Sequence, residues 1–371
     1  MLSYRKLAMR VLGRPLHTGG IDSPRPASQR AAAFILTAVM LTTLAAPAFA
    51  GTWSIENGDI TVKAGETGND VTQNNVTTKN DTDTIITNSD KDTASSHTVT
   101  IETNDKNDKV EVTLDNVNIK ADSGSALTSK GDVTLTLKGD NSLTGGNGGS
   151  GISSSGSLTI SGGENNSLTA QGGSGSGIFS SGGVTISGGT VNATGGTGGT
   201  GENSNGGSGI YIYSSSGSLT VSGGTVTANG GNSGKVGGYG ICSFDRVAIS
   251  GGTVEAAGGN GSTGGGSGIY SSVIDLSGSL ELTAKAGSPT GKALLQNGRE
   301  LDLDTIKDKL GPGAKVTTTD ANGKTKEVSS PLPVEPEGPV IPEESSSSSD
   351  DGSATPVSYT HLRAHETRGN L

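Results

Sequence analysis

Carboxylates are the first side chains to consider for chemistry in this chain. From residue 150 to residue 290 the acids stand singly, at Glu164, Glu202, Asp245, Glu255, Asp275 and Glu281. Glycoside hydrolysis needs two carboxylates within reach of one bond, and a lyase needs a calcium-binding acid cluster beside a basic residue. Arg246 is the only arginine of this stretch, and its position equally suits a solvated surface charge. The spacing favours a non-catalytic protein, with a polysaccharide lyase or hydrolase as the alternative.

The sequence gives little support for a metal-binding or a phosphate-binding site. His97 is the only histidine between residues 51 and 356, so histidine-based catalysis or metal binding is not expected. Glycine runs such as residues 195–201 are not phosphate loops, because no helix follows them. Aspartates are dense enough for a calcium loop at Asp81, Asp83, Asp90, Asp92, Asp105 and Asp108. Solvated turn residues are the favoured interpretation, so calcium is the one cofactor left open and no metal ligand is assigned.

The aromatic residues carry more information. Each of four Gly-Ile steps is followed by one residue of the set Phe179, Tyr211, Cys242 and Tyr270. If the isoleucines point inward, these residues point outward and share one column, because neighbours along a strand alternate in direction. Tyr213 and Phe244, two residues further on, form a parallel outward column. Exposed aromatic rows provide flat apolar platforms on which sugars can stack, and the alternative is a ladder that only stiffens one face.

The elements that position these residues are repeats. The phrase SLTVSGGTVTANGG, from Ser218, recurs with changes from residues 157, 183 and 246. Successive copies begin their first strand at Val133, Leu158, Val184, Leu219 and Val247, at intervals of 25, 26, 35 and 28 residues. An insert at residues 198–207 accounts for the longest interval, so the unit is about 26 residues. Repeats of this length indicate a solenoid.

Within each unit the apolar residues alternate with a period of two, which is the strand pattern. Three short strands and three glycine-bearing corners describe one rung of a right-handed parallel β-helix, an all-β fold. The Gly-Gly pairs after strands are expected to supply backbone with positive φ. Six residues are predicted to point inward: Val184, Ile186, Leu219, Val221, Val247 and Ile249. One rung cannot bury its apolar face alone, so stacked neighbours stabilise one another.

Composition agrees with this fold and limits the partners. With 62 glycines, 3% aromatic and 30% hydrophobic residues, a thin solenoid core fits better than a thick one. The single cysteine, Cys242, excludes an intrachain disulfide. Residues 51–356 hold 18 Lys and Arg against 34 Asp and Glu, a net charge of −16. Such an acidic surface argues against nucleic acid and anionic membranes as partners.

The ends of the chain differ from its middle. Residues 1–50 read as a secretory signal peptide: arginines precede an apolar run at 31–46, and Ala48-Phe49-Ala50 offers a cleavage point before Gly51. We expect no membrane insertion after cleavage, and an exported monomer. Residues 331–356 are predicted to be a disordered Pro/Glu/Ser linker, of the kind that can hold a domain off a cell surface. The tail 357–371 resembles a translated sequencing adapter and is treated as non-native.

The folded part divides by pattern into three sections. Residues 51–131 are an N-terminal cap with irregular opening rungs, in which Trp53 is predicted to cover the first rung. Residues 132–290 are the regular array, and residues 291–330 are the C-terminal cap.

The stretch NDKVEVTLDNVNIKADSGSALTSKGDVTLTLKGDNSLTGGNGGSGI, residues 107–152, and the SGGT repeats after it resemble the secreted carbohydrate-binding β-helix family of clostridial and gut bacteria. The resemblance covers about residues 52–310. It implies a pectate-lyase-like fold, binding of plant-wall polysaccharide and calcium, and no catalysis. The resulting hypothesis is a secreted or cell-surface, non-catalytic carbohydrate-binding protein that holds polysaccharide on the aromatic face. A surface adhesin or structural spacer is the third candidate.

Overall fold

The computed structural model describes residues 50–105, 108–199 and 204–331. The predicted signal peptide, except Ala50, the predicted linker, except Pro331, and the adapter-like tail lie outside the described residues. No helix within the described ranges is long and apolar enough to cross a membrane.

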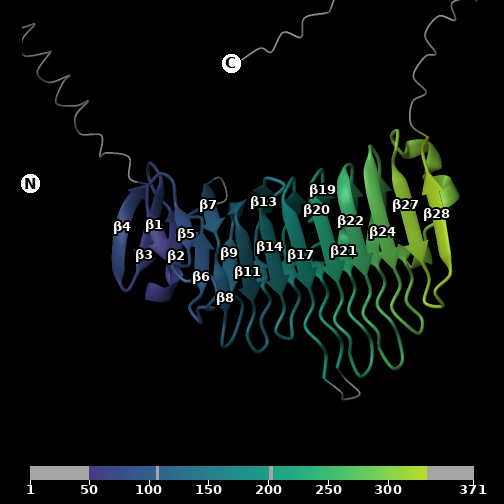
Figure 1. The fold of residues 1–371 in the computed structure, drawn as a ribbon, viewed down its shortest axis with the longest axis horizontal. Helices are drawn as coiled ribbons and strands as arrows, with labels where there is room; N and C mark the ends of the chain where they lie inside the picture. The colour runs from purple at the N-terminus through teal and green to yellow at the C-terminus, as the bar shows by residue number, and fades with distance from the viewer. Residues whose placement is uncertain (1–49, 106–107, 200–203, 332–371) are drawn as a thin grey trace, which may run out of the picture. The chain divides into compact units, whose positions relative to one another are not determined.

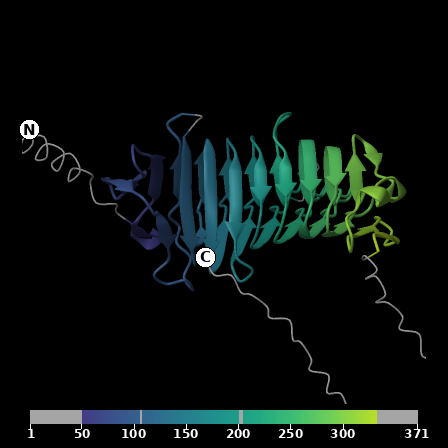
Figure 2. The same ribbon diagram turned by 90° about the horizontal axis from the view of Figure 1, so that it is seen from above.

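The described chain is a parallel β-helix, which confirms the predicted fold. Strands lie across the long axis, with β4 at one end and β28 at the other, and the colour runs from purple to yellow between them (Figure 1). Hydrogen bonding connects them into a 19-stranded and a nine-stranded sheet. The larger sheet comprises two faces of the solenoid. The two faces count as one sheet because β21 and β23 each continue through the corner from one face to the other. The layers of strands are seen from above in Figure 2.

Each complete rung contributes one strand to each of three faces. The first face consists of β2 (Ile60–Ala64), β6 (Val99–Glu102), β9 (Leu127–Lys130), β12 (Ile152–Ser154), β15 (Ile178–Ser180), β18 (Ile210–Ile212), the first parts of β21 (Ile241–Ile249) and β23 (Ile269–Leu276), and β25 (Leu294–Gln296). The second face consists of β1 (Thr52–Ser54), β5 (Ile85–Thr87), β7 (Lys109–Asp115), β10 (Asp132–Lys138), β13 (Leu158–Gly162), β16 (Val184–Ile186), β19 (Leu219–Val221) and the remainders of β21 and β23. The third face consists of β8 (Asn118–Lys120), β11 (Asp140–Thr144), β14 (Ser167–Gln171), β17 (Thr190–Thr194), β20 (Thr225–Asn229), β22 (Gly252–Ala257), β24 (Leu280–Lys285) and β27 (Lys315–Thr319).

The register of the second face reproduces the sequence alignment. Val133 pairs with Leu158, Leu158 with Val184, Val184 with Leu219, and Leu219 with Val247. The 35-residue interval therefore preserves the register, because its insert lies in the loop before β18. All six residues predicted to point inward are at most 1% exposed. The predicted register and core of these rungs are confirmed.

The corner between the second and third faces is a column of asparagine and glycine. Strand pairings place Asn116, Gly139, Asn166, Gly189, Gly224 and Gly252 at equivalent positions. Asn116 has φ +54° and Gly139 has φ +63°, while Gly189, Gly224 and Gly252 each have φ +78°. These are the residue types that adopt this conformation most readily. The expectation of positive φ is correct at these five positions of the corner, and Asn166 is the exception.

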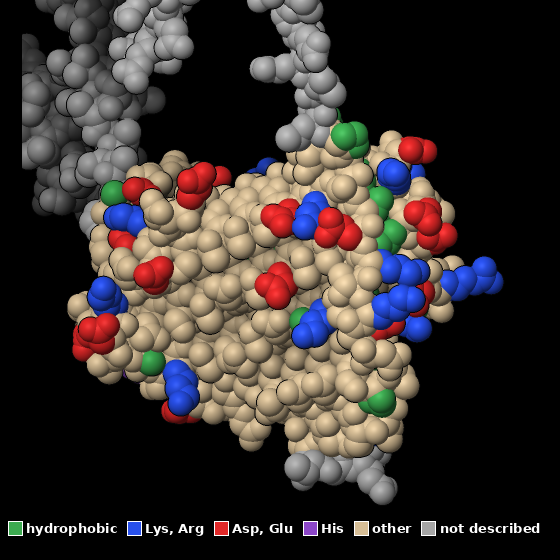
Figure 3. Space-filling model, turned by 45° about the vertical axis from the view of Figure 1, so that its right-hand side comes forward, with side chains coloured by type: hydrophobic (Ala, Val, Ile, Leu, Met, Phe, Trp, Pro, Cys, Tyr) green, Lys and Arg blue, Asp and Glu red, His purple; other side chains and the backbone are tan. Residues whose placement is uncertain are grey.

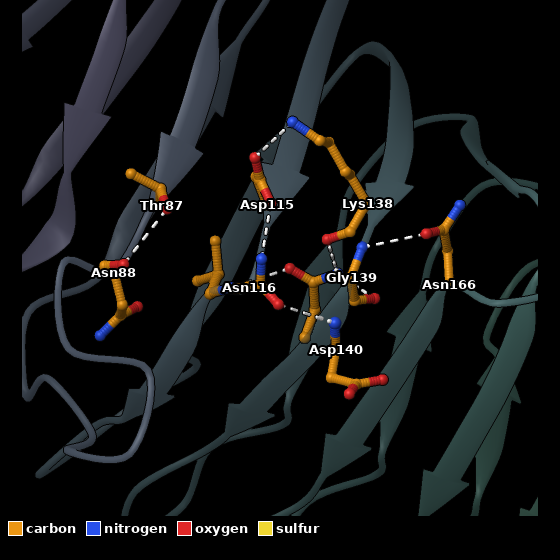
Figure 4. Close-up of polar contacts among 10 residues, drawn as sticks. Thr87, Asn88, Asp115, Asn116, Lys138, Gly139, Asp140 and Asn166 are labelled. Carbon is orange, nitrogen blue, oxygen red and sulfur yellow. Dashed lines mark hydrogen bonds and ion pairs between the residues drawn. The ribbon is translucent and has the colours of Figure 1, made fainter.

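Asparagine side chains also connect successive corners (Figure 4). The amide oxygen of Asn166 accepts from Gly139 N at 3.0 Å, and that of Asn116 accepts from Asp140 N at 3.2 Å. Beside them, the Lys138 ammonium lies 2.8 Å from the Asp115 carboxylate. The asparagines thus satisfy backbone donors at the turn and at the first residue of β11.

The glycines between the third and first faces differ along the solenoid. Gly124 and Gly148, in the earlier loops, have φ +69° and +76° as expected, but in the later loops the expectation of positive φ is wrong. These segments form the row of long loops on one side of the solenoid (Figure 1), and none of their glycines from Gly195 to Gly266 has positive φ within the described ranges. Backbone hydrogen bonds of 2.8 or 2.9 Å connect these glycines in a continuous series. The donor and acceptor pairs are Gly196 N to Gly175 O, Gly207 N to Gly196 O, Gly231 N to Gly207 O, Gly238 N to Gly231 O, Gly259 N to Gly238 O and Gly266 N to Gly259 O. A Cβ on Gly238 would lie 1.8 Å from the carbonyl oxygen of Gly207. Glycine is needed here because backbones approach too closely for any side chain.

A column of buried serines supports the corner between the first and second faces. Its members are Ser129, Ser154, Ser180, Ser243 and Ser271, all at most 1% exposed, with Ile212 in the same register. The Ser180 hydroxyl donates to Gly156 O at 3.3 Å and accepts from Gly182 N at 3.1 Å. Such side chains replace strand hydrogen bonds where the chain turns.

Antiparallel strands close both ends of the solenoid. At the N-terminal end, β3 (Asn69–Gln73) pairs with β2 and β4 (Val76–Asp81). At the C-terminal end, β26 (Arg299–Glu300) pairs with β25, and β28 (Thr325–Ser329) pairs with β27. Three short 3-10 helices accompany these ends: η1 (Ile55–Asn57), η2 (Leu303–Thr305) and η3 (Lys307–Lys309). Trp53 packs against the core beside this N-terminal hairpin.

Candidate functional site

The predicted aromatic residues lie together on the first face. Strand register places Tyr211 beside Phe179 and Cys242, and Cys242 beside Tyr270, so the expected column is present. The isoleucines that precede these residues are fully buried, which directs the next side chain outward. Strands β15, β18, β21 and β23 therefore position the column on four consecutive rungs.

Tyr239 joins these residues, although the sequence analysis does not assign it to the site. It lies two residues before Ile241, where equivalent rungs carry the buried serines Ser176, Ser208 and Ser267. Its ring stacks on Tyr270 with centroids 5.4 Å apart and planes 28° apart. An aromatic residue in a serine column was the signal that could have revealed it. We call Phe179, Tyr211, Tyr213, Tyr239, Phe244 and Tyr270 the aromatic patch.

The patch is a cluster of tilted rings and not the flat row expected from the sequence. Tyr211 contacts Phe179, Tyr213 and Phe244 at centroid distances of 5.8, 6.0 and 6.0 Å, with planes 42° to 68° apart. Phe244 meets Tyr213 and Tyr270 nearly edge-on, at 83° and 76°. Tilted and edge-to-face contacts suit the ring quadrupole better than face-to-face stacking does. Cys242 also interrupts the ring column between Tyr211 and Tyr270.

Exposure divides the patch into a base and a rim. Tyr213 is 61% exposed and Phe244 is 41% exposed, whereas Phe179, Tyr211, Tyr239 and Tyr270 are half-buried. A ligand would therefore meet Tyr213 and Phe244 first. Of the half-buried rings, Tyr211 contacts both of these and Tyr270 contacts Phe244.

Cys242 lies beneath the patch, and its thiol stays protonated at neutral pH. It shares the outward column, yet it is only 1% exposed, since the surrounding rings cover it. Burial raises the pKa of its thiol from 9.0 to about 12. Burial, with smaller contributions from Cys242, Tyr213 and Tyr239, raises the pKa of Tyr211 from 10.0 to about 12. Both groups keep their protons at neutral pH, so neither is a nucleophile there.

Charged side chains border the patch on the strand that carries Phe244. Arg246 Nη2 lies 2.7 Å from Asp275 Oδ2 in an exposed ion pair across two rungs. Asp245 lies between Phe244 and Arg246, at a register shift in β21. The Ser272 hydroxyl donates to the carbonyl of Phe244 at 2.6 Å.

The remaining candidate acids are not brought together by the strand register. Glu255 faces Thr227 and Thr283, and Glu281 faces Thr253 and Lys315. Glu164 lies in a turn, and Glu202 lies outside the described residues. Figure 3 shows one side of the molecule, where charged side chains are scattered over a surface of uncharged polar groups and backbone.

Three of the six aspartates considered for calcium accept local hydrogen bonds. Asp81 is fully buried and accepts from Gly51 N and Trp53 Nε1. Asp90 accepts from Thr93 Oγ1 and Asp92 N, and its pKa is lowered mainly by the Thr93 hydrogen bond. Asp108 Oδ2 accepts from Asp105 N at 3.2 Å. Over the described ranges, no three His, Cys, Asp or Glu side chains are grouped so that they could hold a metal ion.

We compared the chain with protein-family models, with curated proteins and with solved structures. No family model, curated protein or solved structure matches it.

Proposed function

We propose that the protein binds polysaccharide, without cleaving it, at the aromatic patch. The observation that carries this proposal is the concentration of aromatic side chains. Between residues 50 and 331 every Tyr and Phe belongs to the patch, and Trp53 is the only aromatic residue elsewhere. Two of the patch rings, Tyr213 and Phe244, are exposed to water.

The chemistry of the patch suits a sugar. The apolar C–H face of a pyranose packs on an aromatic ring, and its hydroxyl groups hydrogen-bond to polar side chains nearby. Tyr213 and Phe244 offer the rings, while Asp245 and the Arg246–Asp275 ion pair offer donors and acceptors at the border. Exposing apolar rings costs free energy that a stiffening ladder could avoid by burying them. The proposal places the protein outside the cell, after removal of the predicted signal peptide.

Affinity electrophoresis through pectin, xylan and cellulose derivatives tests this function. The double variant Tyr213→Ala and Phe244→Ala should migrate without the retardation that the natural protein shows in at least one of these gels. Each lost ring contact should weaken binding by about 1 kcal/mol. Val76→Ala is the matched control, because Val76 is 65% exposed but lies on β4 at the N-terminal end.

The alternative interpretation is that the patch only stiffens one face of the solenoid. It expects the double variant to melt at a lower temperature while binding remains the same. Equal retardation of the natural protein and the double variant, or none for either protein in any gel, would contradict polysaccharide binding at the patch.

A further inference from the structure

A buried carboxylate lies at the start of the solenoid. Asp81, the last residue of β4, is fully buried. Its carboxylate accepts hydrogen bonds from Gly51 N at 2.9 Å, Trp53 Nε1 at 2.8 Å and Asp83 N at 3.3 Å. All three donors are neutral groups in the uncleaved chain.

Asp81 lacks a cationic partner in the described part of the chain, where no Lys, Arg or His forms an ion pair with it. Lys79 belongs to the same strand, but its ammonium lies 3.1 Å from Asp70. A buried carboxylate without an opposite charge destabilises a fold, and neutral hydrogen bonds offset only part of that cost.

One of the three donors can acquire a charge. Gly51 N is the atom that the predicted cleavage after Ala48-Phe49-Ala50 would release. Ala50 is exposed and Gly51 is buried, so the scissile bond lies where the chain enters the fold. Hydrolysis by a signal peptidase adds water across the Ala50–Gly51 bond, leaving a carboxylate on Ala50 and an amino group on Gly51. With an ordinary pKa of about 7.7–8.0, that amino group is protonated at neutral pH.

We infer that signal-peptide removal before Gly51 creates a buried ion pair between the new α-ammonium of Gly51 and the Asp81 carboxylate, and that this pair locks β1 onto the end of the β-helix. Gly51 O already accepts from Ile85 N at 2.9 Å, at the point where β1 begins to pair with β5. The ion pair therefore fixes the first residue of the mature chain from both of its backbone ends. The inference rests on the predicted export but not on polysaccharide binding.

The first experiment determines where the chain is cut. The full chain is expressed with its own residues 1–50 in a secreting bacterium, and the exported protein is analysed by intact mass and N-terminal sequencing. Gly51 is the expected first residue. A different first residue, or a retained leader, would overturn the inference.

The second experiment measures how the new charge on Gly51 changes thermal stability. Residues 51–371 are produced behind a leader whose protease cuts directly before Gly51, and thermal unfolding is measured before and after the cut. Cutting should raise the midpoint by at least about 2 °C. In a control chain cut before Ala50, the α-ammonium lies on Ala50 and Gly51 N remains a neutral amide. This chain should unfold at the same midpoint as the uncut protein.

Two substitutions complete the test. Asp81→Asn should abolish the difference between cut and uncut protein, whereas Asp70→Asn, which removes the partner of Lys79, should leave it intact. If Asp81→Asn fails to fold, the chain cut before Ala50 still decides the outcome. Equal midpoints for the chains that begin at Gly51 and at Ala50 would refute the ion pair.

Discussion

At the scale of single residues, the aromatic patch determines how two groups ionise: the Cys242 thiol beneath it and the Tyr211 hydroxyl within it. Cys242 and Tyr211 are kept protonated by burial, with pKa values raised to about 12 from 9.0 and 10.0. The unfolded chain has no such cover, so it releases both protons at lower pH than the folded protein does. Stability therefore depends on pH on the alkaline side.

The first prediction follows from that difference. Between about pH 9 and pH 12 the unfolded chain binds fewer protons than the folded one, so the free energy of unfolding should fall as pH rises. Urea unfolding from pH 7.5 to 10.5 measures the fall. The double variant Cys242→Ala and Tyr211→Phe removes both groups and should show a shallower decline. An identical decline in both proteins would mean that other groups control it.

The buried serine column provides a second prediction, because one member differs from the others. The hydroxyl of Ser129 has no hydrogen-bond partner within the described part of the chain, whereas Ser180 bonds to two backbone groups of the corner. Ser180→Ala should lower the free energy of unfolding by about 1 kcal/mol. Ser129→Ala should leave it unchanged or raise it by up to about 1 kcal/mol, since it removes an unpaired buried polar group. Chemical denaturation of both variants checks the contrast, and equal losses would contradict it.

At the scale of elements, the glycine loops are as much a part of the fold as the strands. Their backbones stack rung on rung through hydrogen bonds of 2.8–2.9 Å. The loop segments therefore require glycine for space, while the corner at Gly189, Gly224 and Gly252 requires it for backbone conformation.

A pair of Gly→Ala substitutions separates crowded from open positions. Gly238→Ala places a methyl group 1.8 Å from the Gly207 carbonyl oxygen and should destabilise the protein by at least about 1 kcal/mol. Gly183 has ordinary φ, and its nearest neighbour, Ser218 O, lies 3.4 Å away, so Gly183→Ala should stabilise by about 0.5 kcal/mol. Thermal or urea unfolding of both variants measures the expected loss and the expected gain of stability. If Gly238→Ala is tolerated, the close backbone packing of the loops is wrong.

At the scale of the whole solenoid, stability is shared between neighbouring rungs. A rung in the middle, such as that formed by β15, β16 and β17, pairs on both sides, while β4 and β28 pair on one side only. Hydrogen exchange followed by mass spectrometry should therefore show slow exchange in β15–β17 and faster exchange toward β4 and β28. Uniform protection from end to end would indicate a single cooperative unit instead.

Much of the solenoid was determined by the sequence alone. The period-two alternation predicted which residues of Val184–Ile186 and Leu219–Val221 are buried, and the repeat spacing predicted how these strands pair. A solenoid makes this possible because each rung repeats the environment of the last. Position within the repeat therefore fixes both the direction of a side chain and its neighbours. The aromatic column of Phe179, Tyr211 and Tyr270 was predictable for the same reason.

Only the tertiary structure decided the features that depend on contacts between residues at non-equivalent positions of the repeat. Tyr239 reaches the patch from a serine column, and Cys242 is buried because rings from neighbouring rungs cover it. Asp81 meets Gly51 across 30 residues at the irregular N-terminal end, where no repeat sets the register. A periodic pattern specifies which way a side chain points, but the packing around it specifies how rings tilt, which groups lose water and which backbones touch.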